Sequence, residues 1–593
     1  MPSYADRLKA LRGELAAQGL DGFVVPLTDE HMSEYVGAYA QRLAWLTGFQ
    51  GSAGSAVVLA HEAAIFTDGR YTLQVREQVD GAHWQFESVP QTSPALWLKA
   101  HAGAGARIGY DPWLHTRDWV RQAGEALAAT GGVLVAVECN PVDAIWTDRP
   151  APSDGTVQVH EERHAGRSAA DKRQGIADWL AERKADAVVL SALDSIAWTF
   201  NVRGRDVDRT PVALAYAIVH ADATADLYVA PEKVDGDVIQ HLGNAVRVHD
   251  RADFADALGA LAGRLVAADP ERAVAAIFER LSAGGATILT ARDPAALPKA
   301  IKNLVEIAGH KAAQARDCAA LCRFLHWLSV EGPKGTQDEL SAAARLEAFR
   351  REGGQLQDLS FDTISGSGPN GAVVHYRAAE ATNRPIAPDS LYLVDSGGQY
   401  RDGTTDVTRT LAIGTPTPEM RQRFTLVLKG HVALARATFP QGTRGSQLDI
   451  LARQYLWAQG LDYAHGTGHG VGSFLSVHEG PQRIATYGGG DEPLQAGMIL
   501  SNEPGYYKAG EYGIRIENLV LVEQRDVPGA EREMLGFETL TFAPIDRNLI
   551  ATDLLDAGER GWIDAYHAKV SALIGPQLDD AARIWLEVAC APL

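Results

Sequence analysis

An internal repeat constrains the fold of the first half of this chain more than any other feature. The same spacing separates 5-AD-6 from 170-AD-171 and the apolar run 21-DGFVV-25 from 186-DAVVL-190. In both copies, the pattern of a helix precedes that of a buried strand, and further helix and strand patterns follow. A shared register of this kind indicates duplication of one unit. We therefore expect two related α/β domains in the N-terminal half.

The remainder of the chain requires at least one more domain, because 593 residues exceed what a single hydrophobic core supports. The prolines of 149-RPAPSDG-155 interrupt the apolar pattern and predict a linker. We expect α/β domains over residues 1–155 and 156–310. A strand-rich and glycine-rich domain, ending in a helical extension, is expected over 311–593.

Composition narrows the classes of partner. A formal net charge of −20 argues against nucleic acid or an anionic membrane as the main partner, since phosphates attract clustered Lys and Arg. No run reaches the ~20 apolar residues that a membrane-spanning helix requires. Four cysteines do not make a disulfide framework, and we expect Cys318 and Cys322 to be buried structural thiols. These features predict a cytoplasmic protein.

Two aspartates mark the centre of the segment from about 360 to 520. In 391-LYLVD-395, Asp395 shares a strand face with two leucines, where a carboxylate is costly unless it is paired or bound to metal. Asp406 follows on the expected partner strand, after a turn at 401-RDG-403. A hairpin would bring both carboxylates within reach of one cation. Considered alone, either aspartate is more simply explained as a solvated loop acid.

Three histidines follow in a glycine-rich stretch. In 465-HGTGHGVG-472, glycines flank His465 and His469 and allow the backbone to approach a bound group closely. Neutral imidazole is the commonest nitrogen ligand for divalent metals. The spacing does not decide which of these two histidines is the ligand. His478 follows shortly afterwards, and a structural turn would explain the glycines but not three histidines.

Two glutamates complete the set. Glu503 stands where a strand meets a Pro-Gly turn. In 513-GIRIENLVLV-522, strict alternation predicts one strand with Arg515 and Glu517 side by side on the same face. An ion pair on a sheet surface would explain these two residues if they stood alone.

Four carboxylates and one imidazole suit a pair of hard or borderline divalent ions such as Mn²⁺, Co²⁺ or Zn²⁺. Two ions roughly 3.5–4 Å apart can hold and acidify one water molecule between them. The pattern therefore predicts a hydrolase. It argues against a single structural zinc, which would not need four acids.

The same residues carry a family resemblance that extends over nearly the whole chain. The segment resembles the pita-bread (creatinase-like) metallopeptidases, which include methionine aminopeptidase, prolidase, creatinase and aminopeptidase P. It is most similar to the three-domain, cytosolic type of Xaa-Pro aminopeptidase. The matching runs are 48-GFQGSAGSA-56, 67-TDGRY-71, 196-IAWTFNVRG-204, 367-SGPNGAVVHY-376, 395-DSGGQYRDGTTDVTRT-410, 465-HGTGHGVGSFLSVHEGP-481 and 501-SNEPGYY-507.

The resemblance implies a metal-dependent exopeptidase that releases the N-terminal residue from peptides with proline at the second position. Attack would come from a hydroxide bridging two divalent ions, with Mn²⁺ expected and Zn²⁺ or Co²⁺ as alternatives. Glu503 would accept the proton, His478 would stabilise the oxyanion or relay a proton, and His375 would position the scissile bond. The implied metal ligands, which now include His469 rather than His465, are Asp395, Asp406, His469, Glu503 and Glu517.

Further residues would bind substrate. The resemblance implies that His465 lines the proline pocket and that Tyr507 and Arg515 orient the ligands and the oxyanion. Arg70 would reach the peptide from the N-terminal domain, although a surface ion pair explains that arginine nearly as well. The family also implies a homodimer formed through the catalytic domain.

Three other functions compete with this interpretation. A prolidase would cut only Xaa-Pro dipeptides. A creatinase-like amidinohydrolase would need no metal, and a non-catalytic peptide-binding module would be expected to have lost ligands. All five ligand positions are filled here, which favours the dimetal enzyme.

Overall fold

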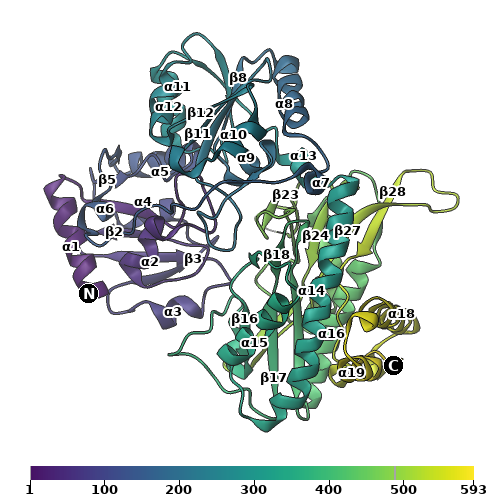
Figure 1. The fold of residues 1–593 in the computed structure, drawn as a ribbon. Helices are drawn as coiled ribbons and strands as arrows, with labels where there is room; N and C mark the ends of the chain where they lie inside the picture. The colour runs from purple at the N-terminus through teal and green to yellow at the C-terminus, as the bar shows by residue number, and fades with distance from the viewer. Residues whose placement is uncertain (1, 487–488) are drawn as a thin grey trace. The chain divides into compact units, whose positions relative to one another are not determined.

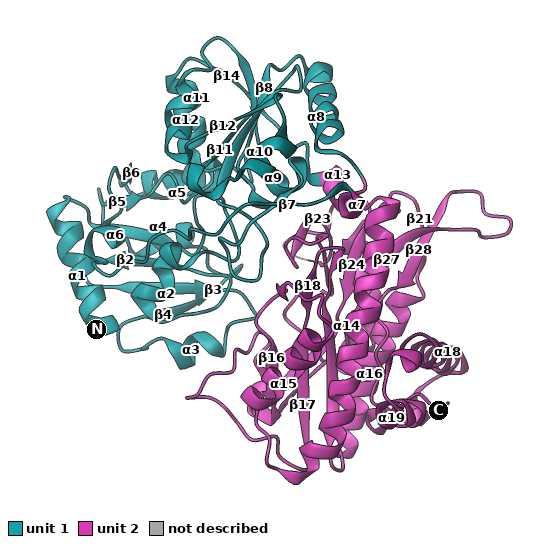
Figure 2. Ribbon diagram, in the orientation of Figure 1, with its two compact units in different colours: residues 1–162, 167–296 teal, residues 163–166, 297–593 magenta. Residues whose placement is uncertain are grey.

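The computed structural model describes residues 2–486 and 489–593, and the chain divides into two compact units (Figures 1 and 2). Unit 1 comprises Met1–Glu162 and Arg167–Ala296, and unit 2 comprises Arg163–Gly166 and Leu297–Leu593. Each unit is described separately below. The predicted boundaries near residues 155 and 310 stay a prediction.

Unit 1 contains two six-stranded sheets with the same strand order. The first has the order β4-β3-β2-β1-β5-β6 and the second β12-β11-β10-β8-β13-β14. In both sheets, the strand from the repeated apolar run pairs antiparallel on one side and parallel on the other. The strands of the first sheet are β1 (Gly22–Pro26), β2 (Ser55–Leu59), β3 (Ala63–Thr67), β4 (Gln85–Ser88), β5 (Arg107–Tyr110) and β6 (Val133–Ala136). Those of the second are β8 (Ala187–Leu190), β10 (Ala215–His220), β11 (Ala225–Val229), β12 (Val246–His249), β13 (Leu265–Ala268) and β14 (Thr287–Thr290).

The repeat extends to the helix caps. Helix α1 (Tyr4–Ala17) begins at a capping box formed by Ser3 and Asp6, and α8 (Ala169–Arg183) begins where Ser168 accepts from the backbone N–H of Asp171. An N-cap serine with an acid at the third helical position stabilises a helix start, which explains why the Ala-Asp pair recurs. The prediction of two related α/β domains is confirmed. The other elements of unit 1 are α2 (Arg42–Thr47), α3 (Gln74–Gln78), α4 (Pro94–His101), α5 (Arg117–Ala128), α6 (Pro141–Ile145), β7 (Gln158–Val159), α9 (Leu193–Thr199), β9 (Val202–Arg203), α10 (Gly236–Leu242), α11 (Phe254–Gly259) and α12 (Ala275–Ala283).

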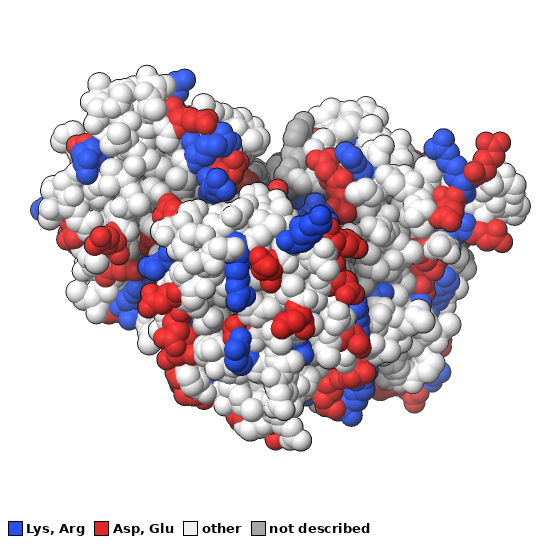
Figure 3. All heavy atoms as spheres, turned by 90° about the horizontal axis from the view of Figure 1, so that it is seen from above, with Lys and Arg blue, Asp and Glu red and all other residues white. Residues whose placement is uncertain are grey.

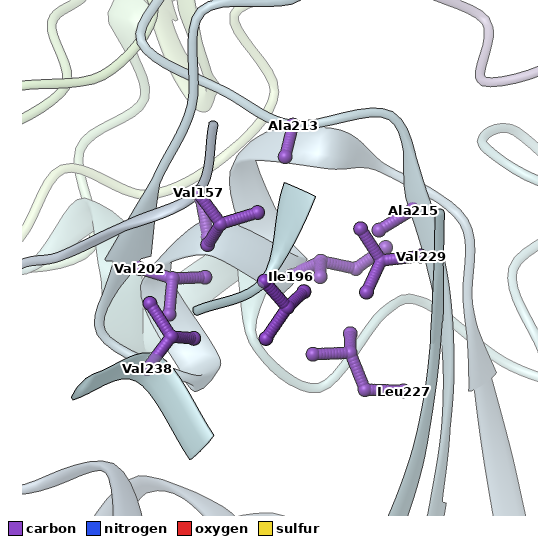
Figure 4. Close-up of a pocket in the computed structure, with 10 residues that line it drawn as sticks. Val157, Ile196, Val202, Ala213, Ala215, Leu227, Val229 and Val238 are labelled. Carbon is purple, nitrogen blue, oxygen red and sulfur yellow. The ribbon is translucent and has the colours of Figure 1, made fainter. Parts of the chain in front are cut away.

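A small cavity lies inside the second sheet domain of unit 1 (Figure 4). Its lining consists only of alanine, valine, leucine and isoleucine side chains, among them Ile196, Leu227 and Val238. Such a lining has no side-chain group to orient a polar ligand. We interpret the cavity as packing space in an apolar core.

Unit 2 is built on two antiparallel sheets, one of three strands and one of six. The first has the order β16-β17-β20 and the second β21-β28-β27-β24-β22-β23, and two smaller sheets are β15-β18-β19 and β25-β26. The strands are β15 (Asp358–Leu359), β16 (Ile364–Ser367), β17 (Ser390–Ser396), β18 (Gly398–Tyr400), β19 (Gly403–Thr404), β20 (Val407–Ile413), β21 (Thr438–Pro440), β22 (Gly468–Gly470), β23 (Glu479–Ile484), β24 (Ile499–Asn502), β25 (Gly505–Lys508), β26 (Tyr512–Arg515), β27 (Asn518–Arg525) and β28 (Met534–Thr539).

Long helices pack against these strands and enclose the largest core. Cys318 and Cys322 on α14 lie in that core with strand residues such as Leu391 and Val407, as the sequence predicted for these two cysteines. The segment 332-GPKG-335 lies between α14 (Leu304–Glu331) and α15 (Glu339–Glu352). The helices are α7 (Glu162–Ala165), α13 (Ala296–Ala300), α14 (Leu304–Glu331), α15 (Glu339–Glu352), α16 (Pro418–Ala435), α17 (Gly445–Trp457), α18 (Ala557–Ile574) and α19 (Asp580–Ala589). Both α7 and α13 begin at a residue that belongs to unit 1.

The surface carries charge of both signs. Acidic and basic side chains are intermixed over the face in Figure 3, so the net charge of −20 is not gathered into one patch on that face. In residues 2–486 and 489–593, no helix combines the length and the apolar character needed to cross a membrane.

Candidate metal centre

Asp395 and Asp406 lie at the point where the predicted hairpin is interrupted. Asp395 pairs in register with Thr408, and Asp406 lies one residue before β20. A Cβ atom on Gly397 would lie only 1.9 Å from the carbonyl oxygen of Thr405, so only glycine permits the close crossing there. The predicted pairing is confirmed, because β17 pairs antiparallel with β20, but the segment between them differs from a simple turn: β18 and β19 pair there within a separate small sheet. Both carboxylates remain at the junction between the two sheets.

His469 faces two of the other candidate ligands. Its Nε2 atom lies 3.4 Å from an oxygen of Asp406 and 3.5 Å from an oxygen of Glu503. Its Nδ1 lies 2.9 Å from the carbonyl oxygen of Gly470, an acceptor, which places the ring proton on Nδ1 in the neutral imidazole. The lone pair on Nε2 then faces two carboxylates. A cation between these groups is the partner that satisfies all three.

Glu517 is held by a threonine rather than by the neighbour that the sequence suggested. The hydroxyl of Thr408 donates to Glu517 at 2.8 Å and accepts from Nε of Arg515 at 3.1 Å. The predicted continuous strand over 513–522 is wrong, because β26 ends at Arg515 and β27 begins at Asn518. Hydrogen bonds from Ile516 to Pro504 and from Glu517 to Thr408 replace the regular ladder at this break. Arg515 and Glu517 are therefore linked through Thr408.

The ligand atoms converge. One ligand atom from each of Asp406, His469 and Glu517 lies within 4.8 Å of the others. Oδ1 of Asp395 and Oδ1 of Asp406 are buried and accept no hydrogen bond from any residue that the structure describes. Buried carboxylate oxygens without partners are costly unless a cation binds them. The donor set of oxygen and imidazole nitrogen therefore fits hard or borderline divalent ions.

The directions of the pKa shifts of the candidate ligands agree with binding of a divalent ion. Burial, followed by the negative charges of Asp395 and Glu503, raises the pKa of Asp406 well above its usual value. Burial and the charge of Asp406 do the same to the pKa of Glu517. Without a cation, each carboxylate therefore favours its protonated form. A divalent ion would displace these protons and reverse the shift.

A chain of hydrogen bonds joins three of the predicted substrate-binding and orienting residues to a ligand. His465 Nε2 lies 2.8 Å from the Tyr507 hydroxyl, to which Arg515 Nη1 donates at 2.7 Å. Arg515 Nη2 in turn donates to Asp395 at 2.6 Å. The structure brings all four residues together, and it places His465 beside Tyr507 rather than among the ligands.

His478 lies beside the predicted ligand His469, and His375 is in turn a neighbour of His478. The ring centroids of His478 and His469 are 4.3 Å apart, and those of His375 and His478 are 6.4 Å apart. Glu503 is oriented by the hydroxyl of Ser501, which donates to Oε1 at 3.1 Å. Glu503 and His478 thus lie next to His469, and His375 lies next to His478.

Arg70 belongs to unit 1, whereas the residues described above belong to unit 2. Its guanidinium donates to Asp68 at 2.7 Å and lies 3.6 Å from Glu34. An ion pair is the alternative that the sequence analysis weighed as nearly equal to substrate binding. The role of Arg70 in substrate binding stays a prediction.

Several supporting residues were missed by sequence reasoning. Asp449 on α17 accepts hydrogen bonds from Thr467 and Thr486, and Arg453 donates to the carbonyl oxygen of His465 at 2.6 Å. The spacing of Asp449 and Arg453 by one helical turn is a usable signal. Their loop partners could not be identified from that spacing. Together, these residues hold the loop that carries both His465 and His469.

A second missed residue organises the segment that leads to His375. Glu339, buried at the start of α15, accepts from the backbone N–H of Ser367 at 2.7 Å and from the Tyr376 hydroxyl at 2.8 Å. It also accepts from the side chain of Asn370. No local pattern marked this glutamate, because all of these partners lie in another segment of the chain.

Comparison with protein families accounts for each part of the chain. Residues 308–524 match the model of metallopeptidase family M24. Residues 7–143 and 148–306 each match a creatinase/prolidase N-terminal domain. Residues 533–593 match the C-terminal region of peptidase M24.

Individual relatives match over the full length. A probable Xaa-Pro aminopeptidase P of Neosartorya fischeri is 42% identical over 609 residues, covering 99% of this chain and 92% of that protein. One of Aspergillus niger is 41% identical, covering 99% of both chains. The crystal structure of X-prolyl aminopeptidase from Caenorhabditis elegans, described as a cytosolic enzyme with a di-nuclear active site, superposes with a TM-score of 0.95. That enzyme is 34% identical, and the match covers 100% of both chains. With this identity over whole chains, and with the metal centre described above, the chain belongs to the Xaa-Pro aminopeptidase P family of M24 metallopeptidases.

Proposed function

We propose that this chain is a dimetal Xaa-Pro aminopeptidase, which hydrolyses the bond between the first residue of a peptide and a proline at the second position. The observation that carries the proposal is the convergence of Asp406, His469 and Glu517 with partnerless oxygens of Asp395 and Asp406. The di-nuclear site named for the Caenorhabditis elegans relative supports it.

Asp395, Asp406, His469, Glu503 and Glu517 would hold the two ions. Bound divalent ions supply a nucleophile at neutral pH by lowering the pKa of water, and they polarise the scissile carbonyl. We propose Mn²⁺ as the resident ion, with Zn²⁺ or Co²⁺ as alternatives, because the site offers oxygens and one imidazole but no thiolate.

Side chains around the centre would carry the proton transfers. Glu503 accepts from Ser501 through Oε1 and extends from the end of β24, which fits the role of proton acceptor. The ring of His478 is a neighbour of both His375 and His469, and we propose that it donates a hydrogen bond to the oxyanion. His375 would hold the scissile bond in place.

Substrate binding would use the neighbouring hydrogen-bonded chain. The amide nitrogen of proline has no hydrogen to donate, so a site that selects proline has to rely on shape rather than on gripping an N–H group. We propose that His465 lines the proline pocket, and that Tyr507 and Arg515 keep the ligands and the oxyanion oriented. Arg70 is proposed to contact the peptide from the N-terminal region.

The cellular setting is also a proposal. The relative of known structure is described as cytosolic, which supports a cytoplasmic location. A homodimer formed through the catalytic domain, peptides as partners, and domain boundaries near residues 155 and 310 complete the proposal.

The experiment that tests the function compares three substrates. The chain, reconstituted with Mn²⁺, Co²⁺ or Zn²⁺, is incubated with Arg-Pro-Pro, a longer Xaa-Pro peptide and an Xaa-Pro dipeptide, and the products are identified by mass spectrometry. Release of the first residue from the tripeptide and the longer peptide is expected. Cleavage of the dipeptide alone would make the chain a prolidase. Absence of both cleavage and bound metal would make it a binding module.

A further inference from the structure

A buried group of three charged side chains lies directly beside His478. One carboxylate oxygen of Glu479 forms an ion pair with the ammonium group of Lys302. The other oxygen forms an ion pair with the ammonium group of Lys299 at 2.8 Å. The side chains are at most 2% exposed. Replacing such a buried charge group by apolar residues of similar size is often neutral or stabilising, so stability alone does not explain it. An alternative explanation for this charge group is that it fixes one conformation of the neighbouring backbone.

Both lysines come from the segment that enters unit 2. Lys299 lies on α13, and Lys302 lies just before α14. The backbone of this segment is itself fixed, because Lys302 donates to the carbonyl oxygen of Gly497 at 2.9 Å, and Ile301 bridges to Met498. The ammonium of Lys302 also donates to the carbonyl oxygen of Lys299 at 2.8 Å. The lysines are thus a rigid anchor rather than flexible surface chains.

Glu479 connects the two lysines to the loop that carries His478. It is the first residue of β23, follows His478 directly and pairs with Gly470. A Cβ atom on Gly472 would lie 3.2 Å from its carboxylate, which therefore sits directly under the loop. At the other end of the loop, Gln399 donates to the carbonyl oxygen of Leu475 at 2.8 Å. The backbone around His478 is therefore held on both sides.

We propose that Glu479, held by Lys299 and Lys302, is a positioning residue that fixes His478 for stabilisation of the oxyanion. The inference rests on the proposed role of His478. A displacement of about 1 Å at such a group is enough to lower the rate a hundredfold. Glu479 itself touches no reacting atom, so its effect must pass through His478.

The test is a double-mutant cycle between Glu479 and His478. Glu479→Gln keeps the size of the side chain but removes the charge that holds both lysines. We expect kcat for Arg-Pro-Pro to fall by about 10–100-fold, while KM and the number of metal ions per chain stay within about threefold. In the His478→Ala background, the same substitution is expected to change the residual kcat by less than about threefold, because the group it positions is already gone.

Three further variants distinguish a positioning role from a general loss of folding. Lys302→Met is expected to reproduce the effect of Glu479→Gln, and Lys302→Arg, which keeps the charge, is expected to restore most of kcat. Lys311→Met is the matched control, since Lys311 pairs with Glu538 at the surface at 2.7 Å. It should leave kcat unchanged.

The outcomes separate the inference from the proposed function. An equal loss from Glu479→Gln with and without His478, or a loss that follows metal content, would overturn the inference while leaving the function intact. A wild-type chain that binds metal and cleaves no Xaa-Pro peptide would overturn both.

Discussion

Arg515 donates from Nη2 to Oδ2 of Asp395 over 2.6 Å, in a site where both side chains are almost fully buried. Burial alone would lower the pKa of Arg515, but its interactions with Tyr507 and with the carboxylate of Asp395 outweigh burial and raise the pKa. The guanidinium therefore remains charged and fixes one oxygen of the carboxylate. The other oxygen, Oδ1, accepts no hydrogen bond from the described residues and is available to an ion.

Removing this arginine tests how far the metal depends on ligand orientation. For Arg515→Gln we expect metal affinity to fall by roughly 10–100-fold, the usual effect of losing a group that orients a ligand. Competition with a chelator measures it. Arg323→Gln, which removes a surface ion pair with Glu352, serves as the control. Unchanged affinity in Arg515→Gln would show that Asp395 needs no such support.

Replacing a ligand should affect the metal-free and the metal-bound protein in opposite directions. Burial and the neighbouring carboxylates make the charged form of Asp406 unfavourable, so Asp406→Asn should stabilise the metal-free chain at pH 7.5 by about 1–3 kcal/mol. The same variant should lose the stabilisation that added Mn²⁺ gives the wild type. Thermal unfolding with EDTA and with Mn²⁺ measures both effects. A variant that is less stable without metal, and equally stabilised by it, would contradict the assignment.

The burial of His431 is expected to make the stability of the fold depend on pH. This buried histidine on α16 lies 3.1 Å from the carbonyl oxygen of Asn502 through Nδ1 and accepts from Asn518 through Nε2 at 3.2 Å. Burial, followed by the charge of Arg409, lowers its pKa to about 3. Between about pH 3 and 6.5 the unfolded chain therefore binds more protons than the folded one. The stability that neutral His431 contributes is complete above pH 6.5 and decreases as the pH falls below it.

The expected size of this effect is about 2 kcal/mol between pH 7.5 and pH 5. Between pH 7.5 and pH 5, the free energy of unfolding should therefore fall by about 2 kcal/mol less in His431→Gln than in the wild type. Denaturant unfolding of the chain, followed for unit 2 at pH 7.5 and at pH 5, measures this difference. His61→Gln, on an exposed turn, is the control. Parallel pH dependence in wild type and His431→Gln would rule out the explanation.

The repeat could be predicted, and candidate ligands could be proposed, because their signals are local, whereas the choice of His469 over His465 came from the family resemblance. The N-cap serines and strand runs of α1, β1, α8 and β8 recur at one spacing, and each candidate ligand stands beside glycine or a strand end. The break between β26 and β27 could not be predicted. Residues 513–522 alternate regularly, and only contacts with the distant Pro504 and Thr408 interrupt the strand.

Supporting residues were hidden for the same physical reason. Glu339 and Asp449 are buried acids whose partners lie in other segments. A single sequence shows the acid, and for Asp449 its helical neighbour Arg453, but gives no sign of the partners in other segments. The relation between Arg515 and Glu517 was predicted as a direct neighbour contact, and it passes instead through the hydroxyl of Thr408.

The C-terminal region is tied to the metal centre through one arginine. Arg409 donates to the carbonyl oxygen of Glu517 at 2.7 Å and to the hydroxyl of Tyr566 on α18 at 2.8 Å. Tyr566→Phe should keep the ring stacked on Trp562 and so preserve α18, while lowering metal affinity by about three- to tenfold. Metal titration measures it, with Tyr455→Phe on α17 as the control. Equal affinity in both variants would show that the C-terminal helices do not support the site.

Metal-dependent cleavage of Arg-Pro-Pro tests the central claim most directly. The metal-free chain is titrated with Mn²⁺, and free arginine and bound metal are measured in the same samples. We expect arginine release to rise with metal to a plateau at two ions per chain, and Asp406→Asn to release none. Intact Arg-Pro-Pro at full occupancy by Mn²⁺, Co²⁺ and Zn²⁺ would contradict the claim.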